Sequence, residues 1–145
     1  MAQPPERQSQ APQETLPTKP SIHMVESYPE HEDLMRTLIE LTGFEGIITA
    51  TPTLDLTIKA LSQTTTHPNL IITHLTDLEN FSLLEKLRKR NSPYTNTPVI
   101  ALHTSPDLDV IERYKQFGAS PLLAPYDIHT FENMVRTIFQ PKKPT

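Results

Sequence analysis

Short apolar runs alternate five times with longer segments between residues 21 and 139. In each longer segment the apolar residues recur at every third or fourth position, which is the spacing of one face of a helix. The runs, which predict buried strands, are 22–25, 47–48, 68–73, 98–102 and 121–124. The expected apolar helix faces are Leu34, Leu38 and Leu41; Leu54, Ile58 and Leu61; Leu78, Phe81, Leu84 and Leu87; Val110 or Ile111, Tyr114 and Phe117; and Ile128, Phe131, Val135 and Ile138.

Residues that start and end helices support the same division. Gly43 and Gly118 stand where the first and fourth helices have to end, and Asp127 stands where the fifth begins. Ser105, followed by Pro106, is expected to cap the fourth helix. Short apolar strands that alternate with such helices predict βαβ units and a parallel sheet covered on both faces. Right-handed crossovers then favour a doubly wound α/β fold.

The two ends of the chain differ in composition from its middle. Residues 1–20 contain one large aliphatic residue, Leu16, among Pro, Gln, Glu and Ser. Such a segment buries too little apolar surface to offset the entropy lost on ordering, so we expect a disordered tail. We expect the same of residues 141–145, which leaves residues 21–140 as one domain.

Composition excludes several classes of function. The 145 residues include no cysteine, three glycines and no glycine-rich phosphate-binding string. Disulfides, thiolate metal sites and a cysteine nucleophile are therefore excluded. A net charge of −4 gives no electrostatic reason to expect a nucleic-acid partner. We expect a cytoplasmic protein with no membrane contact, because no apolar run approaches the roughly 20 residues of a membrane span. We also expect no cofactor.

Four strings resemble those of the receiver domains of bacterial response regulators. Residues 25–30 (Val-Glu-Ser-Tyr-Pro-Glu) are similar to Val-Glu-Asp-Asp-Pro-Glu, and residues 68–74 (Pro-Asn-Leu-Ile-Ile-Thr-His) to Pro-Asp-Leu-Ile-Leu-Leu-Asp. Residues 98–105 (Pro-Val-Ile-Ala-Leu-His-Thr-Ser) are similar to Pro-Val-Ile-Ala-Leu-Thr-Ala-Ser, and residues 117–126 to Ala-Gly-Ala-x-x-Tyr-Leu-x-Lys-Pro-Phe. The resemblance implies a flavodoxin-like sheet of five parallel strands in the order 2-1-3-4-5, with helices on both faces.

The resemblance implies that receiver domains accept a phosphoryl group on an aspartate with the help of Mg²⁺, but of the corresponding positions only Glu26 keeps a matching charge here. His74 stands at the phosphoacceptor position, and Glu26 and Ser27 stand at the positions of the two acidic residues that bind the metal. His103 replaces a hydroxyl residue and Ala124 replaces a lysine, both of which contact the phosphoryl group in the family. Mg²⁺ prefers carboxylates and waters, which one carboxylate beside two imidazoles does not supply. The resemblance therefore implies a pseudo-receiver, a non-enzymatic two-component signalling module that binds protein partners without being phosphorylated.

Glu26, His74 and His103 are all expected at the carboxyl ends of central strands, where open α/β sheets bind ligands. We expect the two imidazoles to fill the vacated pocket and to bond each other, Glu26 or the backbone. The alternative is a ligand- or metal-sensing domain in which these three side chains hold Zn²⁺ or another transition metal. A third hypothesis is an active receiver with a displaced acceptor, Asp77, in the loop after the third strand.

Other polar residues have structural interpretations. Ser27 and Glu30 are spaced as a capping box at the start of the first helix, so Ser27 is assigned no catalytic role. His23 lies in a predicted strand and is expected to be a hydrogen-bonded core residue, whereas His31 is expected in solvent. The basic run 85–90 is expected to be a solvated helix end.

Protein partners are expected on the face built from the fourth helix, the last strand and the last helix. Receiver domains signal there through an aromatic residue on the last strand, a position at which the resemblance places Pro121. Proline has a fixed φ and no rotamer to switch, so the face is expected to hold one state. Opposite charges on it permit a homodimer about a twofold axis. Its expected exposed residues are Glu112, Arg113, Lys115, Glu132 and Arg136.

Overall fold

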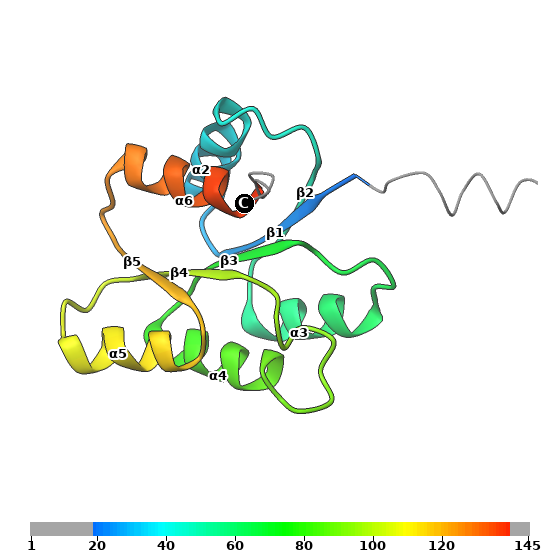
Figure 1. Ribbon diagram of the computed structural model, residues 1–145, viewed down its shortest axis with the longest axis vertical. Coiled ribbons are helices and arrows are strands. Elements are labelled where there is room, and N and C mark those ends of the chain that lie inside the picture. Colours follow the sequence, from blue (N-terminus) through cyan, green and yellow to red (C-terminus); the bar gives the residue numbers. More distant parts are fainter. Residues whose placement is uncertain (1–18, 140–145) are drawn as a thin grey trace, which may run out of the picture.

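The computed structural model describes residues 19–139, so that the predicted tails 1–20 and 141–145 lie outside this range except for Lys19 and Pro20. Its five strands form one parallel sheet in the order β2-β1-β3-β4-β5, which confirms the predicted topology (Figure 1). The strands are β1 (Ser21–Glu26), β2 (Ile47–Thr51), β3 (Leu70–His74), β4 (Val99–His103) and β5 (Ser120–Leu123). The helices are α2 (Pro29–Leu41), α3 (Leu54–Gln63), α4 (Asp77–Leu87), α5 (Leu108–Gln116) and α6 (Ile128–Phe139). None of these helices is long and apolar enough to cross a membrane.

Helices cover both faces of the sheet, as the flavodoxin-like fold requires. Helices α2 and α6 lie on one face, and α3, α4 and α5 lie on the other (Figure 1). Successive residues of a strand point to opposite faces, so Met24 packs in the core under α2 and α6 whereas Val25 packs in the core on the other side. The central strands are buried on both sides, which explains why β3 and β4 are mostly apolar rather than alternating between apolar and polar residues.

Three of the expected helix boundaries are confirmed. Gly43 and Gly118 follow the first and fourth helices with φ of 93° and 75°, a left-handed conformation that glycine adopts without strain. At the start of α6, Oδ2 of Asp127 accepts a hydrogen bond of 2.9 Å from the Thr130 N–H.

Two of the expected caps are wrong. Helix α5 begins after Asp107 rather than after Ser105, and the Asp107 carboxylate is its capping acceptor. Helix α2 begins after Tyr28, and the Ser27 hydroxyl donates instead to the Pro52 carbonyl at 2.8 Å. The preferred partner of Ser27 lies 25 residues away, so it becomes visible only when β1 and β2 are side by side.

The predicted apolar face of α2 is also shifted. Leu34 and Leu41 are 47 % and 65 % exposed, whereas Met35, Leu38 and Ile39 are buried. Both sets have helical spacing, and packing of α2 against the sheet and α6 selects the second.

Candidate functional site

Glu26 and His74 meet at the carboxyl ends of two neighbouring strands. Strands β1 and β3 are parallel, and their register pairs Glu26 with His74 at the last position of each. Nδ1 of His74 lies 2.6 Å from Oε1 of Glu26. Because a carboxylate only accepts hydrogen bonds, Nδ1 of His74 carries the proton and donates it. The side chain of Glu26 is 1 % exposed and that of His74 is 20 % exposed, so the carboxylate is buried and the imidazole is partly open to solvent.

The buried Glu26 carboxylate is stabilised in its charged form. Burial alone raises the pKa of Glu26, but hydrogen bonds from His74 and from the Tyr28 N–H, together with the electrostatic effects of His74 and His31, outweigh it. The pKa therefore lies below its ordinary value. The same charge acts on a neighbour, because burial and then Glu26 raise the pKa of Tyr126. The Glu26 carboxylate is therefore the anionic group of the site.

His31 completes a cluster that the sequence pattern did not predict. Helix α2 follows β1 after two residues, so its first turn lies over the end of β1. Nδ1 of His31 is 3.7 Å from Oε2 of Glu26, and the His31 and His74 ring centroids are 5.6 Å apart. Within residues 19–139, Glu26, His31 and His74 offer one ligand atom each, all within 4.8 Å of one another. His31 is 54 % exposed, so its expected contact with solvent holds while its contact with Glu26 is new.

His103 lies outside this cluster, although it ends the next strand. Its Nδ1 donates to the carbonyl of Ser105 at 2.9 Å, and its ring packs 5.4 Å from that of Tyr114. The expectation that the two imidazoles bond Glu26 or the backbone is confirmed. The predicted grouping of His103 with Glu26 and His74 is wrong, and His31 takes the third place.

A buried polar network next to the site joins β3, β4, α4 and α5. Oδ1 of Asn80 accepts from the Thr73 hydroxyl at 2.7 Å, and its Nδ2 donates to the Leu102 carbonyl at 3.2 Å and to the Tyr114 hydroxyl at 3.1 Å. The Tyr114 hydroxyl in turn donates to Oδ1 of Asp77 at 2.6 Å. Asp77, the alternative phosphoacceptor, was expected in the loop after the third strand. It is instead the first residue of α4, and its carboxylate accepts the hydrogen bond from Tyr114. No local sequence signal predicted this network, because its members come from four elements.

The two remaining family positions carry no charge. The Ala124 N–H donates to the His103 carbonyl at 2.7 Å, and the Ala124 side chain is a methyl group where the family has a lysine. Pro121 pairs with Ala101 of β4 and is partly buried in the edge strand. The residues present do not fit the Mg²⁺ of the family, because Glu26 is the single carboxylate beside two imidazoles.

One expected member of the partner face is largely covered, and another makes a contact outside the face. The Arg113 side chain is exposed as expected, and its guanidinium lies 4.3 Å over the ring of Phe81 in α4. The Glu132 side chain is 12 % exposed, so it is largely covered. The other expected members, Glu112, Lys115 and Arg136, are exposed.

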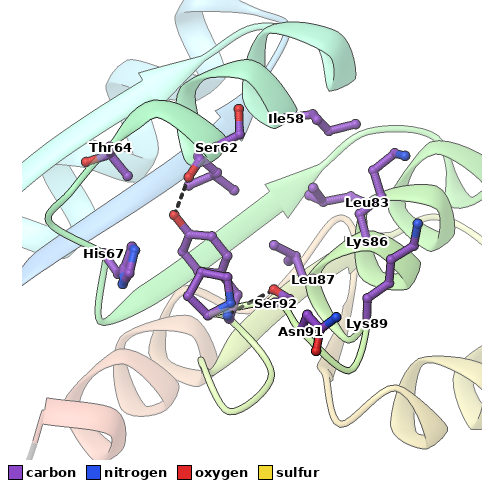
Figure 2. Close-up of a pocket in the computed structure, with 13 residues that line it drawn as sticks. Ile58, Ser62, Thr64, His67, Leu83, Lys86, Leu87, Lys89, Asn91 and Ser92 are labelled. Atoms are coloured by element: carbon purple, nitrogen blue, oxygen red, sulfur yellow. Dashed lines mark hydrogen bonds between the residues drawn. The ribbon is translucent and has the colours of Figure 1, made fainter.

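A separate cavity of about 450 Å³ lies between α3, α4 and the 91–94 segment (Figure 2). Leu83 and Leu87 contribute apolar lining, while Lys86 and Lys89 of α4 also border it. It adjoins the carboxyl ends of both helices, and so lies at the amino ends of the strands, whereas Glu26 lies at their carboxyl ends. It therefore contributes nothing to the Glu26 cluster.

Comparison with known proteins supports the fold through structure alone. No family model matches the chain, and no curated protein has a significantly similar sequence. A signal receiver domain of a histidine kinase from Clostridium thermocellum superposes with a TM-score of 0.74 at 21 % identity, covering 84 % of this chain and 98 % of that one. A signal receiver domain of a DNA-binding response regulator from Colwellia psychrerythraea gives 0.72 at 17 %, with 84 % and 99 % covered.

A chemotaxis response regulator of Vibrio cholerae gives a TM-score of 0.68 at 15 % identity, with 84 % of this chain and all of that one covered (100 %). Each of these chains is matched over nearly its whole length, and the strand order 2-1-3-4-5 with helices on both faces is the one that the resemblance implies. The chain therefore has the fold of response-regulator receiver domains.

Proposed function

We propose that this domain is a pseudo-receiver, a protein-interaction module of a two-component signalling pathway that is not phosphorylated at the usual position. The observation that carries the proposal is the 2.6 Å hydrogen bond between His74 and Glu26. It puts an imidazole, bound to the one remaining carboxylate, where the family resemblance has the phosphoacceptor. An imidazole in this place cannot form the acyl phosphate of that family.

The charges around the site support the same proposal. A phosphoryl group carries close to two negative charges at neutral pH and needs cationic partners. Ala124 supplies no charge at the lysine position, and the ionised Glu26 carboxylate adds a negative one. The His103 ring is committed to the Ser105 carbonyl. The nucleophile, one of the two metal-binding acids and the cation are thus replaced together, and Glu26 alone keeps its charge.

The phosphorylation test is intact-mass measurement after incubation with acetyl phosphate and Mg²⁺, under conditions that preserve acyl phosphates. A receiver domain with an aspartate acceptor, treated in parallel, is the positive control. We expect no mass increase for this chain. A stoichiometric gain of one phosphoryl group would refute the proposal. If Asp77→Asn abolished that gain, the displaced-acceptor hypothesis would replace it.

We further propose that partners bind the face formed by α5, the edge strand β5 and α6. Charged groups of both signs are exposed there on Glu112, Lys115 and Arg136. Leu123 of β5 is 42 % exposed and Ile128 of α6 is 47 % exposed, so apolar surface lies among these charges. A polar rim around exposed apolar residues is typical of protein interfaces, and mixed charges permit two copies to pair about a twofold axis.

Light scattering across a concentration series tests this face for a homodimer. We expect Lys115→Glu and Arg136→Glu to weaken association, because each reverses a charge on the proposed interface. Lys59→Glu, a charge reversal on α3, is the matched control and should leave association unchanged. A monomer at every concentration would exclude the homodimer, and a dimer indifferent to the first two changes would exclude this face.

A further inference from the structure

We infer that Glu26, His31 and His74 form a binding site for a divalent transition-metal ion, with Zn²⁺ the ion that fits best. The inference goes beyond the signalling role and does not depend on it. It rests on a cluster that brings together the end of β1, the first turn of α2 and the end of β3.

The donor set selects the class of ion. Two imidazole nitrogens and one carboxylate oxygen are the three protein ligands of an open zinc site, in which water takes the fourth position. Imidazole suits zinc, copper, nickel and iron, whereas Mg²⁺ and Ca²⁺ prefer oxygen ligands. The ligand set therefore argues for a transition metal in the place where the family holds Mg²⁺.

The distances permit a bound ion after small side-chain rotations. Ligand atoms around a tetrahedral ion lie roughly 3.5 Å apart, given metal–ligand bonds of about 2.1 Å. His31 Nδ1 already lies 3.7 Å from Oε2 of Glu26, and about half of its side chain is exposed, which leaves room for a small rotation. His74 Nδ1 lies 2.6 Å from Oε1 of Glu26 because a proton bridges them. A metal ion would displace that proton and move the two atoms apart.

Groups behind the ligands hold them in place. The Tyr28 N–H donates to Oε2 of Glu26 at 3.1 Å, which orients the buried carboxylate. The Tyr28 ring packs edge-on against His31 with centroids 5.5 Å apart. Contacts of this kind fix ligand orientation in metal sites and strengthen binding. Burial of Glu26 within the fold therefore fixes the central ligand, and half-exposed His31 supplies its nitrogen from the surface.

The experiment is calorimetric titration of the full chain, without a polyhistidine tag and after removal of chelator, with ZnCl₂. We expect one Zn²⁺ per chain, a melting temperature that rises with Zn²⁺ concentration, and no displacement by excess Mg²⁺. His31→Ala and His74→Ala should each lower the affinity at least about tenfold, since even loss of groups behind the ligands has effects of this size. Visible absorption of the Co²⁺-loaded chain should show the tetrahedral spectrum and lose it in both variants.

His129→Ala is the matched control. Nδ1 of His129 lies 3.8 Å from a carboxylate oxygen of Glu132, nearly the distance found between His31 and Glu26. This pair offers two ligand atoms, whereas the proposed site has three. The affinity of the His129→Ala variant for Zn²⁺ should equal that of the parent chain. Absence of Zn²⁺ binding, or binding that His31→Ala leaves unchanged, would overturn the inference. His31 is half exposed, so this variant folds even if His74→Ala does not; a phosphorylation result decides the proposed function separately.

Discussion

The hydroxyl of Tyr114 in α5 donates a hydrogen bond of 2.6 Å to Oδ1 of Asp77, the first residue of α4. Burial, followed by this bond to Asp77, raises the pKa of Tyr114, so the hydroxyl stays protonated over the physiological range. The same oxygen accepts from Nδ2 of Asn80, whose Oδ1 accepts from Thr73. The network therefore joins two helices to the strand that ends at the candidate site.

Removing the hydroxyl should have a measurable cost. We expect Tyr114→Phe to lower the free energy of unfolding by about 1–3 kcal/mol, because it leaves the buried Nδ2 of Asn80 short of an acceptor. Urea denaturation of Tyr28→Phe, a change at a ring that is 62 % exposed, gives the matched control and should stay within about 0.5 kcal/mol. Equal stability of the two variants would show that the network does not stabilise the fold.

His23 is a neutral imidazole in a chain of hydroxyl groups, as its expected place in the core requires. The Thr57 hydroxyl donates to the Thr53 carbonyl, so the Thr51 hydroxyl donates to Thr57 and accepts from Nε2 of His23. Nδ1 of His23 then accepts from the Thr49 hydroxyl at 2.8 Å. Burial lowers the pKa of His23 from its ordinary value of 6.5 to about 4.

The chain should therefore lose stability as the pH falls from about 6.5 to about 4. In this window the unfolded state binds a proton at His23 and the folded state does not, so the contribution is complete above 6.5 and is lost below it. The loss approaches about 3 kcal/mol, because each pKa unit corresponds to about 1.4 kcal/mol. Glu26, whose pKa is lowered, adds a loss of the same sign below its ordinary value of 4.5.

Urea denaturation at several pH values measures this dependence. We expect His23→Leu to reduce stability at pH 7 and to flatten the profile between pH 6.5 and 4.5. His129→Ala, at a side chain that is 86 % exposed, should keep the slope of the parent chain. A slope that survives in His23→Leu would assign the dependence to other groups.

Arg88 holds the end of α4 to two loops, although its basic run was expected to be solvated. Its Nε donates to the Phe117 carbonyl at 2.8 Å, and its Nη1 donates to the carbonyls of Tyr94 and Thr97 at 2.7 and 2.9 Å. We expect Arg88→Met to destabilise the fold by at least about 2 kcal/mol, since several carbonyls lose a charged donor. Arg88→Lys should recover only part, because an ammonium lacks the planar fork. Thermal denaturation with exposed Arg90→Met as control tests this, and equal melting temperatures would contradict it.

Thr76 forms a capping box at the start of α4, whereas Ser27, which has the spacing for one, does not cap α2. The Thr76 hydroxyl accepts from the Glu79 N–H at 3.2 Å and the Glu79 carboxylate accepts from the Thr76 N–H, whereas the Ser27 hydroxyl donates to the Pro52 carbonyl. Thr76→Ala should cost about 1 kcal/mol of unfolding free energy and Ser27→Ala less. Amide exchange should also accelerate in the first turn of α4 but not in that of α2. The reverse order of costs would show that Ser27 caps α2 in solution.

Local patterns predicted a doubly wound α/β sheet, and the family resemblance supplied its strand order, which the structure confirms. Strand runs such as 98–102 are apolar at every position because β4 is buried on both faces, so their type and order are visible in the sequence. Gly118 marks the end of α5 because few other residues adopt its positive φ. The phase of α2 was not predicted, because Leu34 and Met35 satisfy helical spacing equally and only contact with the sheet and α6 separates them.

The site was only half visible in the sequence. Strand ends and family resemblance brought Glu26 and His74 together, because parallel strands in register place their last residues side by side. His31 takes the place in the cluster that was expected for His103, while His103 is buried and bonds the backbone. The path of the chain from β1 into α2 puts the first turn of the helix over Glu26, while the turn after β4 gives His103 a backbone acceptor. The spacing of residues along a chain determines its strands and helices, but which side chains share a site depends on how those elements are placed against one another, and that is decided by tertiary packing.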